Sequence, residues 1–104
     1  MESKFKIDYS GTVLKVTLSG KLDANNSPAL SDGLTKYKGK NITEMVFLAK
    51  DLEYISSAGI RVIVFAKQKI GENSKLFLIG ASEMVLDVIN MTGLANFMII
   101  KDKY

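Results

Sequence analysis

The sequence predicts an α/β domain with a mixed, mostly parallel β-sheet, which begins with an N-terminal β-hairpin and has helices packed on it. Near the N-terminus, two short segments alternate apolar and polar residues, as paired strands with one buried face do. The continuous apolar run 45–49 is typical of a strand buried on both faces, and residues 75–79 predict another strand. Helical segments separate these runs, and strand–helix–strand units favour parallel pairing. We therefore expect the order ββαβαβαβ in a single domain over residues 1–104.

The N-terminal half is expected to fold as a hairpin followed by a helix. The alternating segments 5–9 and 13–18 form the two strands, joined by a tight turn. A polar loop then leads to Ser27, which is a typical N-cap residue, and to Pro28, which favours the first helical position. This helix is expected to stop near Gly39.

The middle of the chain is expected to hold a buried strand, a loop and a second helix. The strand at 45–49 is followed by a more polar segment, 50–56, which we expect to be a loop. Residues 58–70 contain several strand-favouring side chains. However, the length of the segment, Gly71 at the expected C′ position and two lysines in the last turn favour a helix.

The C-terminal part is expected to complete the sheet. The strand at 75–79 is followed by Ser82, a predicted N-cap of a third helix that closes near Gly93. Residues 97–100 are apolar and predict the last strand.

The composition excludes several classes of site. The chain has no cysteine and no histidine, so it cannot form a disulfide, a histidine-dependent nucleophile or a typical zinc site. We expect neither a cofactor nor a metal. There is no apolar stretch of the kind that forms a signal peptide or a membrane-spanning helix, so we expect a cytoplasmic protein without membrane insertion. The net charge of +3 is modest, and the clustered lysines indicate a solvated surface rather than direct contact with nucleic acid.

The best candidate site is the start of the helix at 58–70, where Ser56 and Ser57 lie. A helix N-terminus has unpaired backbone N–H groups and the positive end of the helix dipole, so a phosphate on a serine there is well tolerated. In open α/β sheets the carboxyl ends of the strands are also the usual functional location. The alternative is that one of the two serines is only an N-cap. Gly59 permits close packing or the close approach of a partner.

Three segments resemble the STAS domain family, and in particular the bacterial anti-sigma factor antagonists. Residues 54–60, Tyr-Ile-Ser-Ser-Ala-Gly-Ile, resemble the phosphorylation motif of these proteins. Residues 20–23, Gly-Lys-Leu-Asp, resemble the Gly-x-Leu-Asp loop that follows their second strand. Residues 76–80 and 88–94 resemble their C-terminal strand and helix, which end in Thr-Gly-Leu. The resemblance extends over nearly the whole chain and implies a single STAS-like domain.

The resemblance also implies a non-enzymatic switch in a partner-switching pathway, with no catalytic residues. Ser57 takes the place of the phosphorylated serine, and Ser56 is the alternative acceptor. The unphosphorylated protein would bind an anti-sigma factor that is also a serine kinase, and so release a sigma factor. Phosphorylation by that kinase would lower the affinity, and a serine phosphatase would reset the switch. The implied partner-binding residues are Asp23, Asn25, Ser56, Ser57, Ala58, Gly59, Ile60 and Arg61.

Two positions depart from the pattern of the family. Ser56 stands where an aspartate usually precedes the acceptor, and Leu48 stands where an aspartate often ends the third strand. Both changes remove negative charge near the site, although Asp23 remains and Asp51 and Glu53 could supply acidity. Two other functions therefore stay open: a non-phosphorylated STAS subunit of a larger signalling or lipid-transport assembly, and a small-ligand-binding STAS domain. No oligomeric state follows from the sequence.

Overall fold

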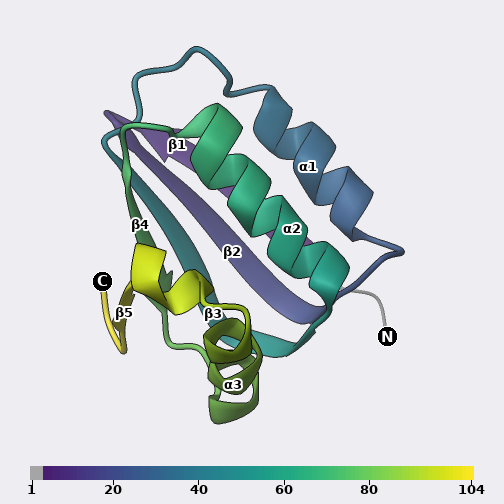
Figure 1. Cartoon of the computed structure of the whole chain (residues 1–104). Helices are drawn as coiled ribbons and strands as arrows, with labels where there is room; N and C mark the ends of the chain where they lie inside the picture. Colours follow the sequence, from purple (N-terminus) through teal and green to yellow (C-terminus); the bar gives the residue numbers. More distant parts are fainter. Residues whose placement is uncertain (1–3) are drawn as a thin grey trace.

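Five strands form one mixed sheet in the order β1-β2-β3-β4-β5 (Figure 1). In the computed structural model, which describes residues 4–104, β1 pairs antiparallel with β2, and every other neighbouring pair is parallel. The elements are β1 (Lys4–Ser10), β2 (Val13–Leu22), α1 (Ser27–Thr35), β3 (Glu44–Ile55), α2 (Ser57–Phe65), the π-helix η1 (Ala66–Ile70), β4 (Lys75–Ile79), α3 (Glu83–Met91), the 3₁₀ helix η2 (Leu94–Phe97) and β5 (Ile99–Lys101). The predicted α/β class, mixed sheet and element order are confirmed.

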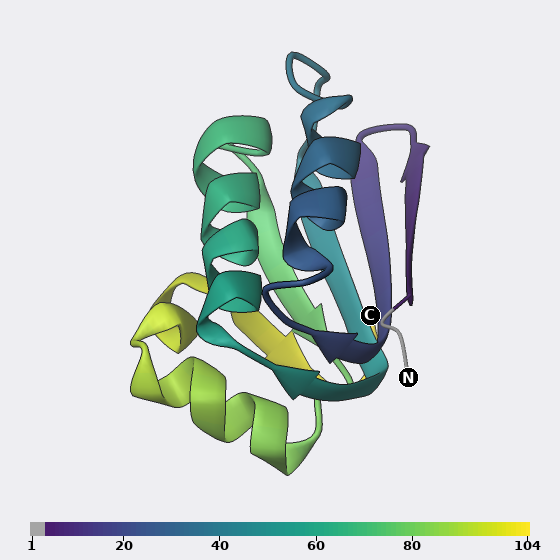
Figure 2. The ribbon, with the colours of Figure 1, turned by 90° about the vertical axis from the view of Figure 1, so that its right-hand side faces the viewer.

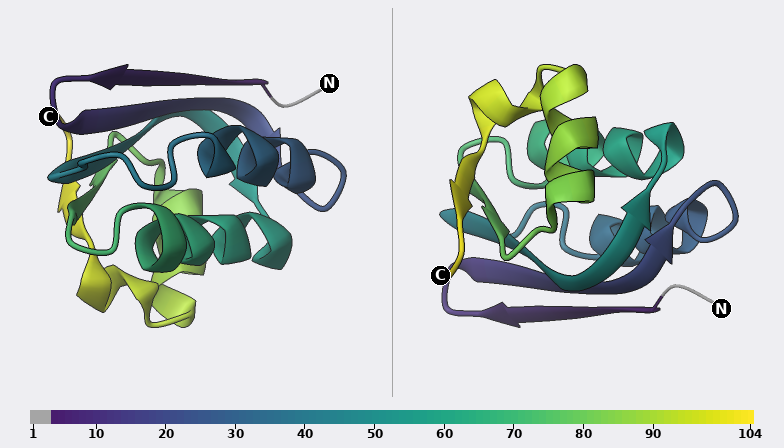
Figure 3. Two further views of the ribbon diagram at one scale, coloured as in Figure 1. Left: turned by 90° about the horizontal axis from the view of Figure 1, so that it is seen from above. Right: turned by 90° about the horizontal axis from the view of Figure 1, so that it is seen from below.

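The helices bury their apolar sides against one face of the sheet. α1 and α2 run side by side along it, and α3 crosses it near one end (Figure 2, Figure 3). The buried apolar side chains of all three helices belong to one large cluster with inward-facing strand residues such as Phe47 and Leu14. A second, smaller cluster contains strand residues alone, because side chains alternate between the two faces of a strand. Its members are Val46, Phe77 and Ile79, with the partly buried Val13 and Leu48 beside them.

β3 is much longer than the apolar run that predicted it. It spans 12 residues, and its parallel pairing with β2 continues to Ile55. The register shifts between Thr17 and Ser19 and again between Gly20 and Lys21 of β2, and at each shift β3 has one residue more than its neighbour. These irregularities are β-bulges, which bend a strand and increase its twist. The loop predicted over residues 50–56 is therefore wrong: all of it except the last residue belongs to β3.

The first helix and its N-cap both lie one residue earlier than predicted. Asn26 is the N-cap of α1, and Ser27 is the first helical residue and is buried. The Asn26 side chain is held by the turn before the helix: its Oδ1 accepts from the backbone N–H of Asp23 at 2.8 Å, and its Nδ2 donates to the carbonyl of Lys21 at 2.8 Å. Because Asn26 is committed to this turn, the helix starts after it.

The second predicted helix is confirmed but changes type along its length. Residues 58–70 are helical throughout, first as α2 and then as η1. Gly71 follows with φ of −119°, so it does not adopt the left-handed conformation typical of the C′ position. Instead, a lysine side chain donates hydrogen bonds to the backbone of the turn that follows η1. The ammonium group of Lys67 donates to three backbone carbonyls, those of Gly71, Glu72 and Ser74.

The C-terminal elements follow the prediction with a short offset. β4 has the predicted bounds, and Ser82 caps α3 as expected, since its Oγ accepts from the N–H of Val85 at 3.2 Å. Gly93 has a φ of +76°, typical of the residue after a helix. Phe97 lies in η2 rather than in the last strand, which begins at Ile99. Within residues 4–104, none of the helices has the length and apolar character needed to span a bilayer.

Candidate functional site

The junction between β3 and α2 is held by Ser56. This residue is the N-cap of α2: its backbone is extended, and its Oγ accepts from the N–H of Gly59 at 3.4 Å. Its carbonyl accepts the first helical bond, from the N–H of Ile60 at 3.0 Å. Its own N–H donates to the carbonyl of Leu22 at the end of β2, at 2.9 Å. Of the two candidate serines, Ser56 is therefore the one with the structural role.

Ser57 has a different environment, although it is the next residue. It is the first residue of α2, its side chain is exposed, and its hydroxyl makes no hydrogen bond within residues 4–104. α2 has no acidic residue in its first turn, so no carboxylate of the helix offsets the positive end of the dipole there. A free hydroxyl in such a place is chemically suited to carry a phosphate.

Gly59 allows the start of α2 to pack against the end of β2. A Cβ atom at this position would lie 2.9 Å from both the carbonyl oxygen and the Cγ of Leu22, and 2.8 Å from Cγ1 of Ile55. Gly59 is buried, and Ile60, with 7% of its surface exposed, is buried as well. Gly59 therefore supports the site from beneath, and Ile60 contributes only a small part of its side chain to the surface.

The turn that follows β2 lies beside this junction. The bond from Ser56 to Leu22 joins the two segments, and both connections lie at the same end of the sheet (Figure 2). Asp23 organises the turn, since its Oδ1 accepts from the N–H of Asn25 at 2.9 Å and its carbonyl accepts from the N–H of Ser27 at 2.9 Å.

The structure thus brings six of the eight predicted residues to one surface. They are Asp23, Asn25, Ser56, Ser57, Ala58 and Arg61, all of them exposed or half-buried.

The two departures from the family pattern are not equivalent in the structure. Leu48 lies inside β3, not at its end, and packs in the small cluster on the face of the sheet opposite the helices. The expectation that Leu48 removes charge near the site is therefore wrong, because the bulged β3 continues well beyond it. Ser56, in contrast, lies at the site itself, so only this departure changes its charge.

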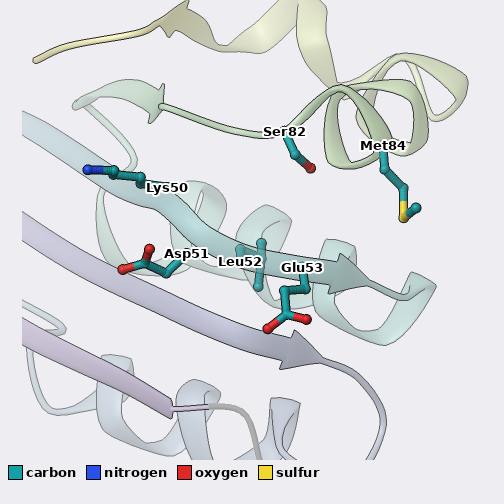
Figure 4. A pocket seen from close by; sticks show the side chains of 6 residues that line it. All are labelled: Lys50, Asp51, Leu52, Glu53, Ser82 and Met84. Carbon is teal, nitrogen blue, oxygen red and sulfur yellow. The ribbon is translucent and has the colours of Figure 1, made fainter.

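Asp51 and Glu53 lie along β3 and not in a loop. They line a shallow pocket of about 550 Å³ together with Lys50, Leu52, Ser82 and Met84 (Figure 4). The figure shows that both carboxylates point away from Ser82 and Met84. Within residues 4–104, no group of three or more acidic side chains is arranged to hold a metal ion.

An apolar groove beside the site was missed by the sequence reasoning. It has a volume of about 460 Å³ and lies between α2 and η2, with Ile60, Val64, Leu94 and Phe97 among its lining residues. Phe97 is 70% exposed, although the sequence predicted it inside a strand. The motif that ends in Thr-Gly-Leu at residues 92–94 pointed to this segment, but it did not indicate an exposed aromatic side chain.

Residues 4–104 match the family model of the STAS domain. The chain belongs to the STAS domain family. Among related STAS proteins, the anti-sigma-B factor antagonist of Staphylococcus aureus is 24% identical over 89 residues, which cover 85% of this chain and 82% of that protein. The anti-sigma-F factor antagonist RsfB of Mycobacterium tuberculosis is 22% identical over 87 residues, which cover 84% of this chain and 70% of that protein.

Solved structures of other bacterial proteins share the fold. An anti-sigma factor antagonist from Mycobacterium paratuberculosis superposes with a TM-score of 0.84 and 18% identity, covering 98% of this chain and 87% of that one. The Bacillus protein SpoIIAA in its phosphorylated form gives a TM-score of 0.73 and 15% identity, covering 93% of this chain and 90% of that one. At these identities the likeness shows the fold alone.

Proposed function

We propose that this STAS protein is a cytoplasmic anti-sigma factor antagonist that works as a phosphorylation-controlled partner switch. In this proposal the unphosphorylated protein binds a serine-kinase anti-sigma factor, and the sigma factor is released. The kinase transfers the γ-phosphoryl group of ATP to a serine Oγ, which loses its proton, and ADP leaves. A serine phosphatase later removes the phosphate. The protein acts by binding and not by catalysis. The observation that carries the proposal is the free, exposed hydroxyl of Ser57 at the first position of α2.

Ser57 is a better phosphate acceptor than Ser56 for a structural reason. The Oγ of Ser56 is used in capping α2, and a phosphate on it would remove that acceptor from the N–H of Gly59. The Ser57 hydroxyl has no such structural role, so its modification leaves the hydrogen bonds of the fold intact. We therefore assign the phosphate to Ser57.

The surface around Ser57 explains how a phosphate would control binding. Ser57 lies among the exposed residues of two connections, so a partner that covers this surface also covers Ser57. A phosphate adds nearly two negative charges. Removing such a charge from water without a compensating partner costs several kcal/mol, and about 1.4 kcal/mol is already a tenfold loss of affinity.

The names of the relatives support this proposal without extending beyond it. The Staphylococcus aureus relative is an anti-sigma-B factor antagonist, and SpoIIAA is an anti-sigma factor antagonist with both an unphosphorylated and a phosphorylated structure. Both SpoIIAA structures share this fold with the same TM-score, 0.73. Both forms of that protein therefore have the fold of this chain.

The test is affinity capture from the source cell, followed by measurements on the purified partner. Tagged wild-type protein should retain an anti-sigma factor with serine kinase activity, and incubation with ATP should place one phosphate on Ser57, detected by tandem mass spectrometry. By titration calorimetry, Ser57→Asp should bind this partner at least about tenfold more weakly than wild type. Ser82→Asp, which adds the same charge at the start of α3, is the matched control and should bind normally.

Three results would contradict the proposal. They are phosphate on Ser56 alone, undiminished phosphorylation of Ser57→Ala, and wild-type affinity of Ser57→Asp. Capture of a multi-subunit assembly with no kinase and no phosphopeptide would instead favour a non-phosphorylated STAS subunit.

A further inference from the structure

Arg61 lies one helical turn after Ser57 on the exposed side of α2. Both residues belong to the regular α-helix Ser57–Phe65, and both side chains are exposed. Residues four apart on an α-helix are neighbours, with their Cβ atoms about 5–6 Å from each other. Arg61 is also the only arginine among the 14 basic residues of the chain. The one guanidinium group of this protein therefore stands beside its candidate phosphate acceptor.

The guanidinium of Arg61 has no acidic partner. Within residues 4–104 a single ion pair occurs, between Lys6 and Asp8, far away along the chain. α2 contains no acidic residue, and Ser56 takes the position at which the family usually has an aspartate. The charged residues of the neighbouring segments include Lys21 at the end of β2, Asp23 in the turn after it and Asp32 on α1. They also include Glu44, Lys50, Asp51 and Glu53 on β3, and Lys67 and Lys69 on η1. None of them forms an ion pair with Arg61.

We propose that Arg61 is the intramolecular partner of a phosphate on Ser57. The planar guanidinium group presents paired N–H donors that match two phosphate oxygens, and such charge-assisted pairs are the strong ones. A phosphoserine at position 57 has three acceptor oxygens, and the Arg61 side chain lies on the same face of the helix, within reach of them. This inference rests on the proposed function, because it concerns the phosphorylated state of the same serine.

The pair gives phosphorylation two effects on the partner-binding surface. It adds negative charge at Ser57, and it withdraws the cation of Arg61 from a partner that would otherwise contact it. It also gives a physical meaning to Ser56. An aspartate at position 56 would compete with the phosphate for Arg61, and its negative charge would also repel the phosphate. A serine at this position does neither, so the guanidinium of Arg61 can pair with the phosphate.

The experiment installs phosphoserine at position 57 during translation, so it needs neither kinase nor partner. The phosphate pKa is then measured by ³¹P NMR in the full chain and in Arg61→Gln, Arg61→Lys and Lys69→Gln. A nearby cation favours the doubly charged phosphate, so the phosphate pKa should be lower in the wild-type chain than in Arg61→Gln by about 0.2–0.4, as expected for a helical i, i+4 pair. Arg61→Lys should lie between the two. Lys69→Gln removes the same charge from the far end of the helical segment and should match wild type.

An equal phosphate pKa in wild type and Arg61→Gln would overturn the inference, as would an equal change in Lys69→Gln. Circular dichroism checks that each variant is folded. If Arg61→Gln does not fold, the phosphate pKa of wild type is compared with that of Arg61→Lys instead. If the pKa difference is found but no kinase partner binds the protein, the proposed function fails while the pair itself stands. If the partner binds and phosphorylates Ser57 but the pKa difference is absent, only the role of Arg61 fails.

Discussion

Leu22 and Gly59 are in such close contact that the start of α2 has no room for a Cβ atom at residue 59. That atom would lie 2.9 Å from the carbonyl oxygen of Leu22, and the same oxygen accepts the N–H of Ser56 at 2.9 Å. The end of β2 and the start of α2 are thus joined by one hydrogen bond and one glycine contact. The position of Ser57, between Ser56 and Gly59, depends on both.

Replacement of this glycine is expected to destabilise the protein. Gly59→Ala should lower the free energy of unfolding by about 1–3 kcal/mol, because the added methyl group meets backbone and cannot be accommodated by a rotamer change. The measurement is urea unfolding followed by circular dichroism. Gly33→Ala in α1 is the control: its Cβ would lie 3.0 Å from the flexible Cδ1 of Ile7, and alanine favours a helix over glycine by about 1 kcal/mol. Gly33→Ala should therefore be neutral or stabilising, and an equal loss in both variants would contradict the packing argument.

The two adjacent serines should differ in their effect on stability. Ser56→Ala removes the cap of α2 and should lower the free energy of unfolding by about 1 kcal/mol. Ser57→Ala removes an exposed hydroxyl without a partner and should change it by less than about 0.5 kcal/mol. Thermal unfolding of the two variants side by side decides the point. The reverse order of stabilities would mean that Ser57 is the cap and would weaken its assignment as the phosphate acceptor.

Lys67 is expected to stabilise the end of the long helical segment. Its Nζ lies 2.6 Å from the carbonyl oxygen of Glu72 and 2.8 Å from that of Ser74. Lys67→Met keeps most of the aliphatic chain but removes the donors, so it should lower the free energy of unfolding by about 1.5–3 kcal/mol. Lys69→Met, at an exposed lysine two residues later, should have an effect below about 0.5 kcal/mol. Similar values for the two variants would show that the bonds of Lys67 contribute nothing.

The two buried serines of the described core should respond in opposite ways to the same substitution. The Oγ of Ser74 donates to the carbonyl of Gly71 at 2.5 Å, whereas the Oγ of Ser27 has no hydrogen-bond partner within residues 4–104. Ser74→Ala should therefore lower the free energy of unfolding by about 1 kcal/mol. Ser27→Ala should leave it unchanged or raise it by up to about 1 kcal/mol, because an unpaired buried hydroxyl is removed. A clear loss of stability in Ser27→Ala, measured by urea unfolding, would show that this hydroxyl is bonded in solution.

Local pattern alone was sufficient to predict the element order and the general place of the site. The apolar run of β4 and the cap at Ser82 were predicted correctly because both signals lie within a few neighbouring residues. The motif around Ser57 also lies in one short segment, so the sequence is sufficient to place the candidate site at the start of α2.

The second half of β3 could not be predicted, because its bulges change the spacing of buried residues. Inward positions that normally recur every second residue recur every third one here, at Ala49, Leu52 and Ile55. In the sequence, a three-residue spacing of apolar side chains is not typical of a strand. It is explained only by the pairing with β2, in which β3 has one extra residue at each bulge. Leu48 precedes both bulges, and ordinary alternation with Phe47 and Ala49 places it on the opposite face of the sheet, away from the site to which the family pattern had assigned it.

The order of elements, the paired serines and the family motifs all follow from the amino-acid sequence. The choice of the serine that caps α2 depends on tertiary contacts, because the backbone of Ser56 is held by a hydrogen bond to Leu22, a distant residue at the end of β2. The tertiary structure also decides that Gly59 and Ile60 are buried while Ser57 and Arg61 are exposed, since burial depends on where β2 ends beneath the helix. Contacts between segments that are distant in the chain are set by packing, and periodicity within one segment carries no information about them.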